Sequence, residues 1–175
     1  MVKIVGLAGL RQGPARPSET NLEEFWRDVQ DKRPDVELPD SFDVRWFGTD
    51  AANTEECLDH ILSGAKYGSC RVPALIKAKG QPMTCLGDVS VLIDWNGNPR
   101  LAIRYTKTQE VVFDQVTDEH VAYEGLPHLK KAETWRKVHH GHWNGELAPF
   151  GLSFSPDMSI VLETYEVLYS APSNR

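Results

Sequence analysis

The 175-residue sequence contains few cysteines and no long apolar run. Cys57, Cys70 and Cys85 are far apart and form no Cys-x-x-Cys pair, so neither a disulfide framework nor a structural zinc site is predicted. The apolar run at residues 2–10 is too short to span a bilayer and lacks a strongly basic flank, which argues against a membrane segment or a signal peptide. We therefore expect a cytoplasmic protein with no membrane partner.

An excess of positive charge is also absent, since the formal net charge is −6. This argues against a surface that binds long nucleic acid mainly by counterion release, although it is compatible with a local basic cleft. The charge favours a small ligand or a short strand as the partner. The glycines in residues 6–9 match neither a Walker motif nor a full Gly-x-Gly-x-x-Gly, and no Ser-His-Asp elbow is present.

Hydrophobic spacing predicts several helices. They cover residues 20–33, 53–63, 118–123 and 130–144. Thr20 and Glu23 would form the capping box of the first helix, and Gly64 stands where a left-handed residue would end the second. Because a chain of this length can bury a core, we predict one domain over residues 20–170 after a flexible N-terminal extension over residues 1–19.

The middle of the chain has the features of a β region. Strands are predicted over residues 44–47, 71–78, 89–95, 101–106, 111–113 and 159–169. Asn96-Gly97 is a strong two-residue hairpin signal and predicts antiparallel pairing of the strands on either side of it. The density of short strands indicates a barrel or a sandwich.

Lys66 and Ser69 follow the second predicted helix directly and are the sharpest candidates for chemistry. A lysine beside a hydroxyl group acts as a base if burial favours its neutral form, or as an anion clamp if it stays charged. The alternatives are a solvated surface lysine and a serine that bonds its own backbone. Glu124, next to a glycine, is either a functional carboxylate or a solvated one.

Basic and aromatic residues near this stretch are candidates for ligand binding. Arg71, Lys77 and Lys79 would alternate along the predicted strand and share a face, which is either a phosphate-facing cleft or only the wet face of the strand. Tyr67 and Trp95 would stack on a base, with packing as the alternative for Trp95.

The run His139-His140-Gly141-His142 contains side chains that are good metal ligands. Neighbouring residues on a helix point about 100° apart, so only His139 and His142 share a face. No carboxylate with ligand spacing stands nearby in the sequence. We therefore predict no metal site in this run.

Several short motifs are informative through their order. They are Gly64, Lys66 and Ser69 after a helix, the Gly87-Asp88 turn, Glu124-Gly125, and Trp135 with His139 in a helix. This order resembles the ASCH domain family, small PUA-like barrels linked to RNA binding and nucleotide chemistry. The resemblance covers most of the chain and implies an α+β fold, a PUA-like small β-barrel flanked by helices.

The resemblance also implies a site. One member of the family is a small amidohydrolase that deacetylates acetylated cytidine with a Lys, Thr and Glu set, which corresponds to Lys66, Ser69 and Glu124 here. In such chemistry the hydroxyl attacks the amide carbonyl, the lysine takes or relays its proton, and the carboxylate orients the lysine or the substrate amine. No cofactor is then expected. The residues expected to contact the substrate are Tyr67, Arg71, Lys77, Trp135 and His139.

A related member resembles a ribonuclease that uses a divalent metal on single-stranded RNA, and a metal cofactor would be implied in that case. The family pattern is not matched everywhere, because serine replaces threonine at Ser69 and the residues at 67–68 and 126–128 differ from the usual ones. The sequence therefore predicts a hydrolase directed at RNA or a modified nucleoside. The alternative is a non-catalytic RNA or nucleotide reader, in which Lys66 and Arg71 hold phosphate.

Overall fold

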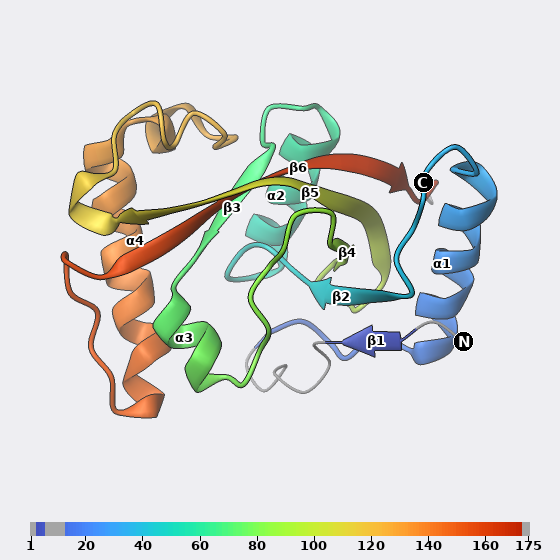
Figure 1. The fold of residues 1–175 in the computed structure, drawn as a ribbon, viewed down its shortest axis with the longest axis horizontal. Coiled ribbons are helices and arrows are strands. Elements are labelled where there is room, and N and C mark those ends of the chain that lie inside the picture. Colours follow the sequence, from blue (N-terminus) through green and yellow to red (C-terminus); the bar gives the residue numbers. More distant parts are fainter. Residues whose placement is uncertain (1–2, 6–12, 173–175) are drawn as a thin grey trace. The chain divides into compact units, whose positions relative to one another are not determined.

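The computed structural model describes residues 3–5 and 13–172 of the chain. These residues form four α-helices, six β-strands and short 3-10 turns (Figure 1). They fall into two compact units. The first unit is made of the chain up to residue 64, residues 87–105 and the chain from residue 165 onward, and the second is made of residues 65–86 and 106–164.

Strands of the first unit are joined mainly by parallel pairing. β1 (Lys3–Val5) runs parallel to β2 (Ser41–Arg45), and β2 runs parallel to β4 (Val89–Ile93). A hairpin then leads from β4 into β5 (Pro99–Val112), and these two strands are antiparallel. Asp94 stabilises the hairpin turn, because its carboxylate accepts hydrogen bonds from two backbone N–H groups in the turn.

Two helices supply the rest of the first unit's core. α1 (Glu19–Lys32) places Trp26 against Phe42 of β2, with ring centroids 4.7 Å apart. α2 (Ala51–Leu62) packs its buried apolar residues against β4 and β5. The predicted left-handed residue after this helix is confirmed, since Gly64 has a φ of 75°, which only glycine adopts without steric cost.

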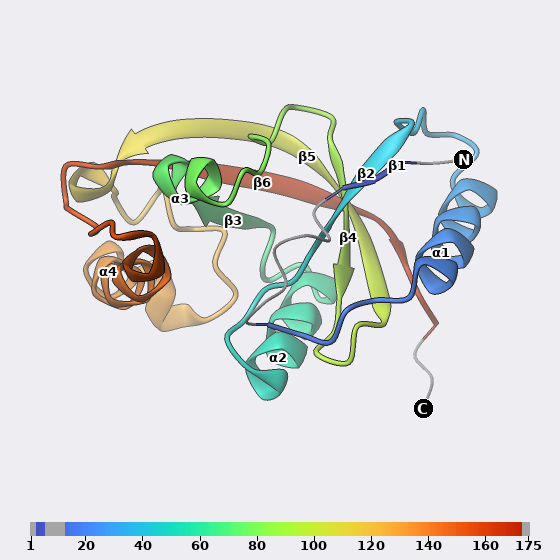
Figure 2. The same cartoon turned by 90° about the horizontal axis from the view of Figure 1, so that it is seen from below.

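The second unit is built around β3 (Gly68–Arg71) and β6 (Ser159–Ser170), which pair antiparallel in a register that sets Ser69 opposite Glu163. α4 (Ala132–Leu147) is seen nearly end-on in Figure 2 and packs below the second-unit parts of β5 and β6. The core of this unit is aromatic, and its large buried side chains are Phe113, Tyr123, Trp135, Trp143 and Phe154.

Hydrogen bonding gives the strand order β1-β2-β4-β5-β6-β3. The sheet is mixed and open, with β1 and β3 as its edges, so it does not close into a barrel. β5 and β6 each contribute residues to both units. The predicted α+β class is confirmed.

Most predicted elements are present with shifted ends. The helices near residues 20–33, 53–63 and 130–144 are α1, α2 and α4, and the closing strand near 159–169 is β6. The hairpin at Asn96-Gly97 is confirmed, but the strands predicted over 101–106 and 111–113 form the single long β5. Side chains outside the predicted starts cap the first two helices, since Ser18 caps α1 and Asp50 caps α2.

The predicted strand over residues 71–78 is wrong. Only Arg71 of this range belongs to a strand, and α3 (Pro73–Ala78) follows it. Proline at the first helical position explains the helix start, because its fixed φ suits a helix and its missing N–H would have no partner there anyway. The residues after Pro73 include alanine, leucine and lysine, all good helix formers.

The predicted helix over residues 118–123 is also wrong, since this segment is a series of turns. Asp118, in this segment, accepts a 2.7 Å hydrogen bond from the backbone N–H of Ala132 at the start of α4. The Asp118 side chain therefore caps α4, which begins 14 residues further on. A short 3-10 helix, Pro127–Lys130, leads into α4.

Part of the predicted N-terminal extension, residues 1–2 and 6–12, lies outside the described residues. Residues 3–5 of that extension form β1. The boundary at residue 20 stays a prediction. Within the described ranges, no helix combines the length and the hydropathy that crossing a membrane would require.

Candidate functional site

Lys66 and Glu124 form a buried ion pair in the second unit. The Lys66 Nζ lies 2.5 Å from Glu124 Oε2, and the two residues are only 9% and 5% exposed. The other carboxylate oxygen of Glu124 accepts a 3.1 Å hydrogen bond from the indole N–H of Trp135. The ammonium group also lies 5.5 Å from the ring centroid of Tyr123, within range of a cation–π contact. The Lys66 amine therefore lies against both a carboxylate and an aromatic ring.

Ser69 has a different carboxylate partner. Its hydroxyl group donates a 3.0 Å hydrogen bond to Glu163 Oε2, across the β3–β6 pair. Glu163 is 0% exposed. A buried carboxylate carries a large desolvation cost unless hydrogen bonds or charges compensate it. The fold therefore keeps the Ser69–Glu163 contact despite the desolvation cost of burying the Glu163 carboxylate.

The thiol of Cys70 lies within electrostatic range of both carboxylate pairs. Burial first, and then the negative charge of Glu124, raises the pKa of Cys70 above its usual range. Lys66 and Glu163 also act on this pKa, in opposite directions. Cys70 is therefore an inert thiol at neutral pH, and both pairs lie close enough to influence it.

Trp135 and His139 support Glu124 from α4. The His139 ring stacks on Trp135 with centroids 4.0 Å apart, and its Nδ1 donates a 2.9 Å hydrogen bond to the Trp135 carbonyl. Burial is the main cause that lowers the pKa of His139 to about 4. Trp135 itself is completely buried. Its contact with the site therefore passes through the Glu124 carboxylate.

The basic residues expected on one strand face are separated by the helix that replaces the strand. Arg71 ends β3, and its guanidinium donates to Gln81 and Thr84 at 3.0 and 3.2 Å, so it holds the segment after α3. Lys77 is exposed on α3. Lys79 pairs with Glu146 at 2.7 Å. The predicted shared basic face does not exist.

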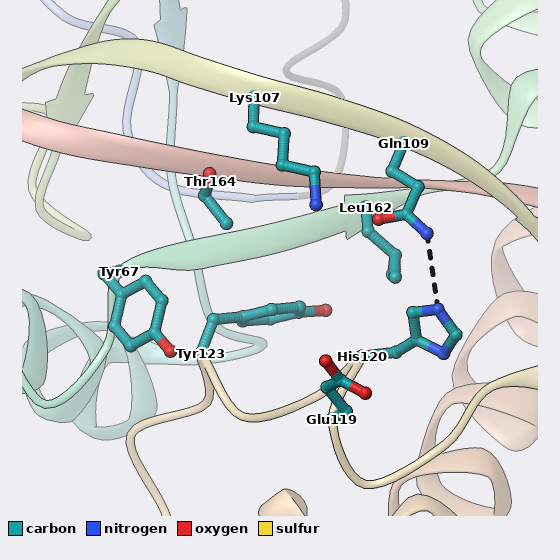
Figure 3. Close-up of a pocket in the computed structure, with 8 residues that line it drawn as sticks. All are labelled: Tyr67, Lys107, Gln109, Glu119, His120, Tyr123, Leu162 and Thr164. Atoms are coloured by element: carbon teal, nitrogen blue, oxygen red, sulfur yellow. Dashed lines mark hydrogen bonds between the residues drawn. The ribbon is translucent and has the colours of Figure 1, made fainter.

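Tyr67 lies at a polar pocket of about 290 Å³ (Figure 3). The pocket is lined by Tyr67, Lys107, Gln109, Glu119, His120, Tyr123, Leu162 and Thr164. Tyr67 is the only predicted site residue in this lining. Lys66 is not part of the lining, but its Nζ lies 5.5 Å from the ring centroid of Tyr123, which is.

Sequence reasoning missed Glu163 and most of the pocket. Glu163 directly follows the apolar run Ile160-Val161-Leu162 in a predicted strand, and an acid at such a position is a signal of a functional or paired carboxylate. The pocket residues had no comparable signal, because they come from β5, β6 and the turns at 118–123.

The donor set around Lys66 does not suit a divalent metal. Both oxygens of Glu124 are engaged, and the Lys66 ammonium already supplies the positive charge beside them. Among the residues that the structure describes, no cluster of three or more His, Cys, Asp or Glu side chains has the geometry to hold an ion. No step through a metal is therefore derived for this site.

The mixed, open six-stranded sheet and the four α-helices of the described residues define an α+β class of protein. Residues 43–169 match the model of the ASCH domain family, and the chain belongs to this family, which has a PUA-like fold.

Two solved structures are similar to the chain over most of its length. The ASCH domain from Lactobacillus crispatus JV V101 is 29% identical, with a TM-score of 0.76, over 86% of this chain and 96% of that one. Protein EF3133 from Enterococcus faecalis V583 is 26% identical, with a TM-score of 0.75, over 86% of this chain and 89% of that one. No curated protein matches the chain.

Proposed function

We propose that this ASCH domain protein is a hydrolase that cleaves an amide on a modified nucleoside of the acetylated cytidine type. The observation that carries the proposal is the contact between Lys66 and Glu124, which are 58 residues apart in the sequence. Ser69, three residues after Lys66, adds a hydroxyl group held by a second buried carboxylate. A nucleophile, a carboxylate base and a cation are thus present in one unit.

The hydrogen bonds favour Glu163 over Lys66 as the group that takes the Ser69 proton. The Lys66 ammonium donates to Glu124, whereas Ser69 donates to Glu163. In the proposed first step, Ser69 Oγ bonds to the amide carbonyl carbon while its proton moves to Glu163. The Lys66 charge stabilises the negative oxygen that forms on the substrate. The C–N bond then breaks, and the proton from Glu163 leaves with the amine.

Water completes the reaction by attacking the ester on Ser69. Its proton moves to Glu163 as the new C–O bond forms, and the Ser69 oxygen recovers a proton as the acid leaves. Glu124 takes no part in proton transfer in this scheme. It holds Lys66 in place, and Trp135 in turn holds Glu124.

A second candidate function is a non-catalytic reader of RNA or nucleotides. The pocket beside Tyr67 favours it, because the pocket combines aromatic rings with polar groups and needs no reaction to be useful. The ASCH fold, which is often associated with RNA, is compatible with both candidates. The metal-dependent ribonuclease is less well supported, because the donor set around Lys66 does not suit a metal.

The proposal is tested by incubating the purified protein with acetylated cytidine and, separately, with short single-stranded RNA. Products are followed by chromatography with and without a chelator. We expect release of cytidine and acetate, with no effect of the chelator. Ser69→Ala should abolish turnover, and Glu163→Gln should lower kcat by about 10²- to 10⁴-fold. Ser153→Ala, at an exposed serine, is the matched control.

Each outcome decides between the candidates. Turnover that persists in Ser69→Ala would contradict the nucleophile, and turnover that persists in Glu163→Gln would contradict the proton acceptor. RNA cleavage that stops with a chelator would favour the nuclease. Binding without any product would leave the reader as the better function.

A further inference from the structure

We infer that the pocket lined by Tyr67, Lys107 and Tyr123 binds a nucleoside monophosphate, with the base against a tyrosine ring and the phosphate at Lys107. The inference rests on the proposed function only in taking a nucleoside-type ligand as the substrate. It adds that the protein recognises the phosphorylated form, either as a free nucleotide or as one unit of an RNA strand.

The backbone at Tyr67 and Gly68 contacts Tyr123 and holds the two tyrosines at the pocket. The Tyr67 N–H donates a 3.1 Å hydrogen bond to the Tyr123 carbonyl. A Cβ atom at Gly68 would lie 2.6 Å from Tyr123 Cγ, so the glycine backbone packs directly on that ring and fixes it. Tyr67 is 44% exposed. An exposed ring and a fixed, buried ring that line one pocket suit a flat ligand, because bases stack on aromatic side chains.

Lys107 supplies the charge for a phosphate. It projects from β5, and its ammonium group points into the space above the Tyr123 ring (Figure 3). Lys79 and Lys131 of the same unit pair with Glu146 and Asp118, whereas Lys107 forms no ion pair within the described residues. A lysine that faces a pocket without an acidic partner favours an anionic ligand.

A fixed histidine determines which donors the pocket offers. The backbone N–H of Thr117 donates to His120 Nδ1 at 3.1 Å, so the neutral ring carries its proton on Nε2. Gln109 Nε2 lies 3.3 Å from that Nε2. Because two N–H groups cannot bond to each other, the Gln109 amide is assigned with its oxygen toward the ring. The amide NH₂ group is then left as a donor on the far side. Lys107 and Gln109 therefore both favour acceptor atoms, such as phosphate or carbonyl oxygens.

Glu119 and the size of the pocket limit the ligand further. A carboxylate is an acceptor, and the hydroxyl groups of a ribose are suitable donors to Glu119. Ligand pockets for small molecules are typically about 300–1,000 Å³, so the volume of about 290 Å³ lies at the lower end. The pocket thus fits one nucleotide unit.

The test compares the binding of cytidine, cytidine 5′-monophosphate and a cytidine dinucleotide to the full chain by titration calorimetry. We expect the monophosphate to bind at least about tenfold more tightly than cytidine, which corresponds to one charge-assisted contact. Lys107→Met should remove this preference, because it weakens the binding of the monophosphate more than that of cytidine. Tyr67→Ala should lower the affinity for both ligands by about five- to 100-fold, since it removes a stacking surface. Lys137→Met, at an exposed lysine of α4, is the control and should change neither affinity.

Equal affinities for cytidine and its monophosphate would overturn the inference, as would a preference that survives Lys107→Met. A preference for the dinucleotide over the monophosphate would identify RNA as the source of the nucleotide, and the reverse would identify the free nucleotide. Phosphate-dependent binding without hydrolysis of acetylated cytidine would refute only the hydrolase. Hydrolysis without phosphate-dependent binding would refute only the pocket.

Discussion

Glu124 and Glu163 are two buried carboxylates with different partners, and the proposed mechanism gives them different roles. Glu124 is held by Lys66 and Trp135, so it is fully occupied. Glu163 accepts from Ser69, the one hydroxyl group in the predicted catalytic set. In the proposed mechanism, Glu124 therefore positions a cation, whereas Glu163 activates a nucleophile.

The Lys66–Glu124 pair should be strongly coupled. Removal of one member leaves the other charge buried, so we expect Lys66→Met or Glu124→Gln to lower the free energy of unfolding by about 3–5 kcal/mol. The double variant should lose much less than the sum of the two. Urea unfolding of all four proteins gives the coupling energy.

The exposed pair Lys131–Asp118 is the matched control, with side chains that are 71% and 55% exposed. Its double-mutant cycle should show no measurable coupling. Equal coupling in the two cycles would mean that the Lys66–Glu124 pair behaves as a surface ion pair, and that Lys66 is not the buried cation that the proposed mechanism needs.

His139 should make stability depend on pH below neutrality. Its pKa is about 4 in the folded protein against an ordinary value of 6.5, so between these values the unfolded chain binds more protons than the folded one. Stability therefore falls as the pH drops from 6.5 to about 4, and this contribution is constant outside that window. The difference corresponds to at most about 3 kcal/mol.

We expect His139→Gln to flatten this part of the pH profile, as measured by urea unfolding between pH 4 and 7. His128→Gln, at an exposed histidine, is the control for the loss of an imidazole. A His139→Gln profile as steep as that of the wild type would show that another group causes the pH dependence.

At the scale of the elements, β3 brings the site together. It presents Ser69 to Glu163 on β6, while Gly68 lets the backbone lie against Tyr123. α4 contributes Trp135, which donates to Glu124, and the turns at 118–123 carry both Tyr123 and the cap of α4. The same short segments thus position the ion pair and the pocket.

Gly68→Ala should be costly because the added Cβ would lie 2.6 Å from Tyr123 Cγ and 2.7 Å from the Glu163 carbonyl oxygen. We expect a loss of about 1–3 kcal/mol in the free energy of unfolding, together with weaker binding in the pocket. Gly141→Ala is the contrasting change, since a Cβ there meets nothing within 4 Å on α4.

Gly141→Ala should stabilise the protein by about 0.5–1 kcal/mol, because alanine is the better helix former. Thermal and urea unfolding compare the two variants with the wild type. If Gly68→Ala leaves the free energy of unfolding unchanged, Tyr123 moves freely. That result would contradict a pocket with a fixed ring.

For the whole molecule, the net charge of −6 and the pocket of about 290 Å³ both favour a short ligand. An acidic protein gains little from each extra phosphate outside a local basic site. The ligand is therefore expected to be read one nucleotide at a time.

We expect a 20-nucleotide single-stranded RNA to bind less than about tenfold more tightly than a dinucleotide. The logarithm of the affinity should fall with the logarithm of salt concentration with a slope of about −0.7 per phosphate contact, and a slope near that value indicates one contact. Fluorescence anisotropy over a salt series measures both. A steep slope with strong length dependence would indicate an extended RNA-binding surface instead.

The amino-acid sequence by itself determined the main helices, the hairpin at Asn96-Gly97 and the left-handed Gly64, because each depends on spacing within one short segment. The order of its motifs was also sufficient to recognise the ASCH family. The strand predicted at 71–78 failed because a proline in the first turn of a helix and a proline after a strand give similar local patterns.

Only the tertiary structure decided which charges meet. Lys66 and Glu124 are 58 residues apart, and Ser69 and Glu163 are 94 residues apart, so no local pattern relates them. The pairing of β3 with β6 and the packing of Trp135 create these contacts. The pocket depends on the same pairing, because its lining comes from segments that are distant in the sequence and become neighbours only when the sheet forms.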